Sequence, residues 1–105
     1  MEPLAPAGSD AEIWLIHSPP AGTESAIVRG GVCNGDFSFA ELCRNGQGPR
    51  LALCGHVHDR RCWWDRLGET LVINPGCDLA ETILRFAVVD LAAGVVTYRG
   101  ETVRF

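Results

Sequence analysis

Two histidines separated by a single residue are the feature of this chain that points most directly to chemistry. His56 and His58 follow Gly55, shortly after the apolar run 51–53. In an extended segment residues i and i+2 project to the same face, and a glycine lets the backbone bend, so the two imidazoles can converge on one metal ion or on two adjacent ions. The third histidine, His17, also follows an apolar run. Every histidine stands at the exit of a predicted core strand, which makes metal binding the first chemistry to consider.

Two short buried strands are expected to position these histidines, at residues 12–17 and 51–54. The second is a continuous apolar run of the kind that is buried on both faces of a sheet. Segment 18–35 lies between them and is broken by prolines and glycines without periodicity. A loop of that length inside a small domain is usually functional or mobile.

One short helix is predicted at residues 38–45. Ser38 and Glu41 form a capping box, and Phe37 and Leu42 have the spacing of a hydrophobic staple. Gly46 then provides a terminator for the helix.

The remainder of the chain predicts β-structure. Segments 61–66 and 70–73 flank a hairpin turn, and Asn74-Pro75-Gly76 ends the second of them. A second hairpin joins 84–89 to 95–99, and an extended piece follows at 102–105. We therefore expect a strand-rich α/β chain organised as a flexible segment, 1–11, and a single small domain, 12–105.

Composition excludes several classes of function. The chain has 105 residues and a net charge of −4, and its only basic pair is Arg60-Arg61, so a nucleic-acid or anionic-membrane surface is not expected. No uncharged apolar stretch is long enough to span a membrane, and the first residues do not resemble a signal peptide. Five cysteines without a C-x-x-C spacing predict reduced thiols in the cytoplasm.

Three motifs in this order resemble the C-terminal half of a calcineurin-like metallophosphoesterase: His17-Ser18-Pro19-Pro20, Gly55-His56-Val57-His58 and Asn74-Pro75-Gly76. The resemblance implies an αββα sandwich that uses two divalent metals, manganese, iron or zinc, to hydrolyse a phosphate mono- or diester. It also implies that His17 and His56 hold one metal and His58 the other. Segment 18–35 would form part of the rim over the substrate, and Asn74-Pro75-Gly76 a structural turn near the site.

The sequence departs from that family in its ligands. The carboxylates that the family's first half supplies, including the aspartate that bridges the two metals, have no counterpart here. Three neutral imidazoles cannot hold two dications together against their repulsion. The sequence therefore predicts half of a bimetallic site, with at most one weakly bound metal and little activity alone. It further predicts a homo-oligomer or a complementing N-terminal half.

Two other classes of function remain open. A non-catalytic remnant could act as an interaction or oligomerisation module, because half a sandwich exposes sheet edges. A small structural zinc module could use Cys54, His56, His58 and Cys62, although Cys54 should point away from the histidines.

Individual side chains near the motifs have simpler expected roles. The tryptophans are expected to pack in the core, the Arg60-Arg61 pair to be solvated, and Asp59 to be a possible carboxylate that orients a histidine. The tryptophans are Trp14, Trp63 and Trp64.

Overall fold

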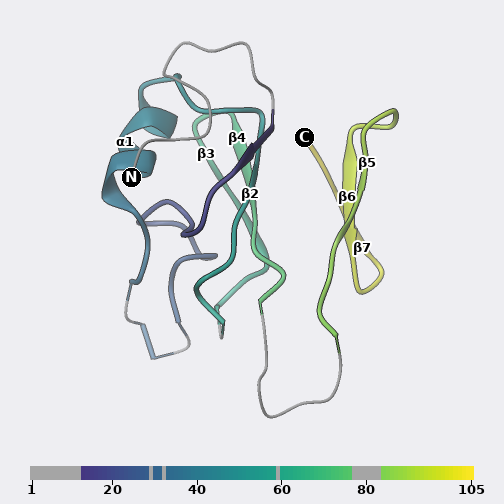
Figure 1. Ribbon diagram of the computed structural model, residues 1–105, viewed down its shortest axis with the longest axis horizontal. Helices are drawn as coiled ribbons and strands as arrows, with labels where there is room; N and C mark the ends of the chain where they lie inside the picture. The colour runs from purple at the N-terminus through teal and green to yellow at the C-terminus, as the bar shows by residue number, and fades with distance from the viewer. Residues whose placement is uncertain (1–12, 29, 32, 59, 77–83) are drawn as a thin grey trace.

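The computed structural model describes residues 13–28, 30–31, 33–58, 60–76 and 84–105. These residues form three layers: a helix, a four-stranded sheet and a three-stranded sheet (Figure 1). In chain order the elements are β1 (Ile13–Leu15), α1 (Phe37–Arg44), β2 (Leu51–Leu53), β3 (Trp64–Leu67), β4 (Thr70–Ile73), β5 (Val88–Asp90), β6 (Val95–Tyr98) and β7 (Glu101–Arg104). The strand-rich α/β architecture is confirmed, while the predicted flexible segment 1–11 lies outside the described residues.

The four-stranded sheet has the order β1-β2-β4-β3. Its first three strands are parallel, and β3 pairs antiparallel with β4. The register places Leu15 beside Leu53 and Leu53 beside Ile73, so the parallel strands end in one row. All four residues of β4 are buried, as expected for a parallel strand covered on both faces.

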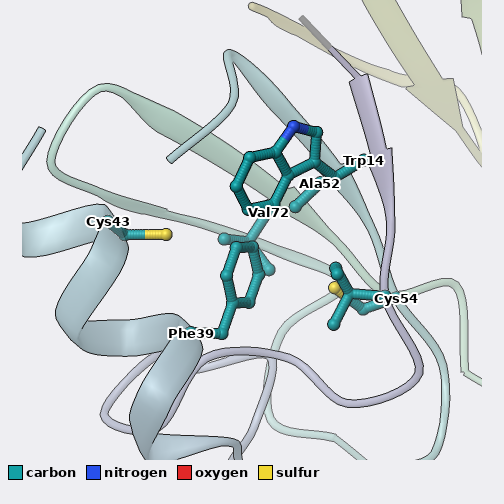
Figure 2. Close-up of a cluster of buried hydrophobic side chains, with 7 residues drawn as sticks. Trp14, Phe39, Cys43, Ala52, Cys54 and Val72 are labelled. Atoms are coloured by element: carbon teal, nitrogen blue, oxygen red, sulfur yellow. The ribbon is translucent and has the colours of Figure 1, made fainter. Parts of the chain in front are cut away.

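Helix α1 covers one face of this sheet. Trp14 of β1 stacks on Phe39 of the helix, with ring centroids 5.9 Å apart. Figure 2 shows these two rings beside Cys43 and Val72, which fill the space between the helix and the sheet. The predicted packing role of Trp14 is confirmed.

The start of the helix differs from the prediction. Its N-cap is Asp36, not Ser38, and the Asp36 carboxylate accepts a hydrogen bond from the backbone N–H of Phe39 at 2.8 Å. The predicted staple is wrong, because Phe37 is exposed in the first turn. Starting at Asp36 turns Phe39 and Cys43 toward the sheet, and that burial outweighs the alternative cap. Gly46, with φ +74°, follows the last turn as predicted.

The three-stranded sheet covers the other face of the four-stranded sheet. It is an antiparallel meander in the order β5-β6-β7. Val96, Tyr98 and Val103 from this sheet belong to one buried cluster with Leu51, Trp63, Leu71 and Ile73. Both predicted hairpins are confirmed, although β5 begins at Val88 and is shorter than expected.

One flank of the sandwich is closed and the other carries exposed apolar side chains. On the closed flank the Trp63 indole donates to the Glu101 carboxylate at 2.6 Å, and the Arg66 guanidinium donates to the Arg104 carbonyl, which ties β3 to β7. The opposite edge strands are β1 and β5. Exposed apolar residues lie on β1, on β5 and in the segments next to β5: Ile13, Leu15, Leu84, Phe86, Val88 and Leu91.

Candidate metal site

Three motifs meet at the carboxyl edge of the parallel strands. His17, Gly55 and Pro75 each stand two residues beyond the end of β1, β2 and β4, and those three ends are in register. The backbone N–H of Gly55 donates to the carbonyl of His17 at 3.0 Å, so the pairing continues past the strands. Ligands commonly bind beyond the carboxyl ends of strands in α/β sheets, and this edge is therefore the candidate site.

The structure brings two of the three histidines together. His17 Nε2 lies 3.1 Å from His56 Nδ1, and the ring centroids are 4.8 Å apart with planes inclined by 54°. Both side chains are exposed to solvent at the sheet edge. Without a metal, this contact is a hydrogen bond in which one ring donates an N–H to the other.

The His17–His56 pair fits one metal ion. Two nitrogens bound to the same ion at about 2.0 to 2.1 Å in tetrahedral or octahedral geometry stand about 2.9 to 3.4 Å apart. The observed separation of 3.1 Å lies inside that range. The distance between the two nitrogens is thus compatible with coordination of one ion, and imidazole suits zinc and iron.

His58 does not complete this site. It is exposed, and within the described ranges no three His, Cys, Asp or Glu side chains are grouped so that they could hold a metal. Cys54, His56, His58 and Cys62 are among these described residues, so they are not grouped as the tetrahedral zinc module requires. Cys54 belongs instead to the buried cluster under the helix, away from the exposed imidazoles, as the sequence predicts.

Asn74 anchors the histidine loop. Its side chain is completely buried, and its amide nitrogen donates to the carbonyls of Val57, at 2.9 Å, and Ser25, at 3.2 Å. Its amide oxygen accepts from the backbone N–H of Gly76 at 3.0 Å. The Asn74-Pro75-Gly76 turn is thus near the candidate site, and it also ties segment 18–35 to that site. The Asn-Pro-Gly turn signal locates this residue in the sequence, but nothing there identifies its two carbonyl partners.

The prediction of a solvated arginine pair is wrong for Arg60. Its side chain is buried, its Nε donates to the Asn74 carbonyl at 2.8 Å, and its guanidinium lies 5.4 Å from the centre of the Tyr98 ring. The carbonyl and the aromatic face stabilise the cation there. Arg61 is exposed and pairs with Glu24 at 3.3 Å, as expected of a surface residue. Asp59, a possible orienting carboxylate, lies outside the described residues.

The thiols are unpaired where the structure describes them. Cys33, Cys43, Cys54 and Cys62 are free, and Cys77 lies outside the described ranges. Burial, together with the nearby Cys43, raises the pKa of Cys54 to about 12. Burial also raises the pKa of Cys43. The two buried thiols are therefore core residues rather than nucleophiles at neutral pH.

No helix in the described parts of the chain is long and apolar enough to cross a membrane.

Comparison with known proteins identifies the family. The model of the family described as "Metallophosphoesterase, calcineurin superfamily" matches residues 5–99, nearly the whole chain. The chain therefore belongs to the calcineurin superfamily of metallophosphoesterases, whose members generally use divalent metals. The resemblance inferred from the motifs is confirmed at this level. Comparisons with curated proteins and with solved structures found no match.

Proposed function

We propose that this chain is a metal-dependent phosphoesterase domain that carries one half of its site, in which His17 and His56 hold a single divalent ion. The observation that supports this most is the 3.1 Å separation between His17 Nε2 and His56 Nδ1 at the carboxyl edge of the sheet. The reaction proposed is hydrolysis of a phosphate mono- or diester. Water oxygen bonds to phosphorus and loses a proton, the ester P–O bond breaks, and the departing alkoxide takes up a proton in exchange for the one that the water released.

Each histidine has a defined part in this proposal. When bound, a manganese, iron or zinc ion supplies positive charge that stabilises phosphoryl oxygens and makes water a better nucleophile. His17 and His56 bind through neutral ring nitrogens, so each must have that nitrogen deprotonated. His58 is proposed as a ligand only for a second ion. It is exposed and lies beside the Asn74-Pro75-Gly76 turn, so its imidazole is accessible to such an ion. Activity of the chain alone is expected to be low, since carboxylates normally help to hold two ions.

The experiment is a calorimetric titration of the whole chain with Zn²⁺ and Mn²⁺, followed by hydrolysis of bis(p-nitrophenyl) phosphate. We expect one ion per chain and slow turnover. His17→Ala and His56→Ala should each weaken binding by at least about tenfold, because a ligand of the ion is lost.

His58→Ala is the matched control, since it removes an exposed imidazole from the same loop without touching the His17–His56 pair. Its affinity for the first ion should match that of the original chain. Binding that survives His56→Ala unchanged, or that fails equally in all three variants, contradicts the proposal. Rapid, histidine-dependent turnover would show that the chain completes its site without added carboxylates.

A second candidate function is that of an interaction or oligomerisation module. The observation in its favour is that the edge strand β1 and the segment leading into the edge strand β5 carry exposed apolar side chains, such as Leu15, which is 66% exposed, and Phe86, which is 59% exposed. Open strand edges beside exposed apolar side chains favour pairing with another chain. We propose a second copy of this chain as the partner, because the same edge is then present on both sides of a two-fold interface. A complementing N-terminal half is the alternative occupant.

We also propose a cytoplasmic location. The support is chemical: the free thiols of Cys33 and Cys62, neither of them buried, persist best where thiols are kept reduced.

A further inference from the structure

The backbone at His56 is strained. Its φ is +64°, a left-handed value that residues with a side chain rarely adopt. The N–H of Val57 donates to the carbonyl of Gly55 at 2.7 Å, so His56 is the central residue of a three-residue turn. A γ-turn with positive φ is rare and strained even for a favourable residue. It persists only where the surrounding structure imposes it.

The residues on both sides of His56 are held in place. Upstream, the N–H of Gly55 donates to the carbonyl of His17 at 3.0 Å, which fixes the start of the turn to the neighbouring strand exit. Downstream, the side chain of Val57 is buried and its carbonyl accepts from the Asn74 amide at 2.9 Å. His56 itself is exposed, and its side chain hydrogen-bonds to His17 and to no other residue in the described part of the chain. The turn is therefore imposed from its two ends rather than by the imidazole.

Asn74 is suited to hold the downstream end. The amide donates to two carbonyls and accepts from one N–H, and the backbone of Asn74 is held in turn by Arg60 and Trp63. The Asn74 side chain is completely buried, so water cannot replace these hydrogen-bond partners. An aspartate of the same shape has no donors for the two carbonyls and would face them with negative charge.

We propose that Asn74 is a positioning residue, which keeps His56 in its strained turn and thereby aims the imidazole at His17. It acts through the carbonyl of Val57, one residue from His56. The relevance to metal binding rests on the function proposed above. The backbone strain at His56 and the orientation of its ring toward His17 are properties of the metal-free chain and are testable there.

The first test compares Asn74→Asp with Thr70→Val by NMR of the imidazole nitrogens in the metal-free chain. Thr70 is a matched control because it is buried at the far end of β4, the strand that Asn74 follows, and its hydroxyl donates to the Pro49 carbonyl at 2.5 Å. Both variants should lower the melting temperature. Only Asn74→Asp should shift the His17 and His56 ring signals, and only it should weaken Co²⁺ binding by at least about tenfold. Unchanged ring signals in Asn74→Asp, or equal changes in both variants, overturn the proposal.

The second test measures the strain itself. His56→Gly and His56→Ala both remove the imidazole, but only glycine relieves a positive φ, so the glycine variant should melt about 4 to 8 °C higher. In the Asn74→Asp background, the difference in melting temperature between His56→Gly and His56→Ala should be smaller, because the turn is no longer imposed. Arg99, with φ +49° in the β6–β7 turn, is the control: the gap between Arg99→Gly and Arg99→Ala should be the same in both backgrounds.

The outcomes separate this proposal from the proposed function. If Asn74→Asp does not fold, Asn74→Ser, which also lacks the amide group, replaces it in both tests. A gap of zero between the melting temperatures of His56→Gly and His56→Ala overturns the inference in either case. One outcome is that the original chain binds no Co²⁺ while Asn74→Asp still shifts the ring signals and still reduces the difference in melting temperature between His56→Gly and His56→Ala, which is the coupling between Asn74 and His56. In that case only the metal proposal fails. If metal binds and the coupling is absent, only the positioning role fails.

Discussion

The buried thiol of Cys54 should make this domain lose stability at alkaline pH. Burial, with a smaller contribution from Cys43, raises the pKa of Cys54 from 9.0 to about 12 in the folded chain. A group whose folded pKa exceeds its unfolded pKa contributes its full stability below the unfolded value and loses it as the pH rises toward the folded value. For one thiol with these pKa values, the free energy of unfolding should fall by about 1.4 kcal/mol between about pH 8 and about pH 10.

The chain is well suited to this measurement because it contains no lysine. Among the described residues, the groups besides Cys54 whose pKa is shifted are Cys43 and Tyr98. Burial of Tyr98 favours a higher pKa, but the positive charges of Arg60 and Arg85 outweigh it and lower the pKa of Tyr98. Tyr98 therefore adds stability as the pH rises, opposite in sign to Cys54. Comparing two variants that share Tyr98 cancels its effect.

The assay is urea denaturation of the original chain and of Cys54→Ala at about pH 8 and about pH 10, with a reductant present. Cys54→Ala should be less stable at the lower pH, since a buried side chain is truncated. Between about pH 8 and about pH 10, the free energy of unfolding of Cys54→Ala should fall by about 1.4 kcal/mol less than that of the original chain. An identical pH dependence of the two chains would refute the reasoning. So would alkylation of Cys54 in the folded chain as fast as that of the exposed Cys33.

Two further predictions concern the flank and the turns. Sedimentation velocity should show concentration-dependent self-association of the isolated chain, reduced by Leu15→Ser or Phe86→Ser because each removes an exposed apolar side chain of the flank; a stable monomer at high concentration would contradict this. Gly68→Ala should cost more than about 2 kcal/mol, because its φ is +59° and a Cβ there would clash with the Cys43 carbonyl oxygen. Gly100→Ala, with φ +86° and open space around it, should cost only about 1 kcal/mol, and equal losses in urea denaturation would contradict the steric argument.

The local elements were predictable because their signals are local. The apolar runs ending near Leu15 and Leu53, the turn residues before Thr70 and after Ile73, and the alternation along the last strands all mark elements that the structure contains. Element boundaries were less predictable. Asp36 and Ser38 are both acceptable caps by residue type, and only the burial of Phe39 and Cys43 against the sheet selects Asp36.

Arg60 shows where residue type misleads. An arginine beside another arginine in a polar stretch predicts a solvated pair, yet only Arg61 is at the surface. Arg60 is buried because the Asn74 carbonyl and the Tyr98 ring reach it from segments 14 and 38 residues further along the chain. Such partners are determined by tertiary packing, and no short window of sequence contains them.

The sequence by itself determined the family, the strand-rich α/β architecture and the three motifs from which a site can be built, because these depend on residue type, order and spacing. Tertiary structure decided which motif residues meet. Parallel pairing of β1, β2 and β4 in one register brings residues 39 positions apart to a nitrogen–nitrogen distance of 3.1 Å, and a strained turn held by Asn74 determines where His56 lies. The physical reason is that strand pairing and buried hydrogen bonds act between segments that are distant in sequence, whereas residue patterns report only on their own segment.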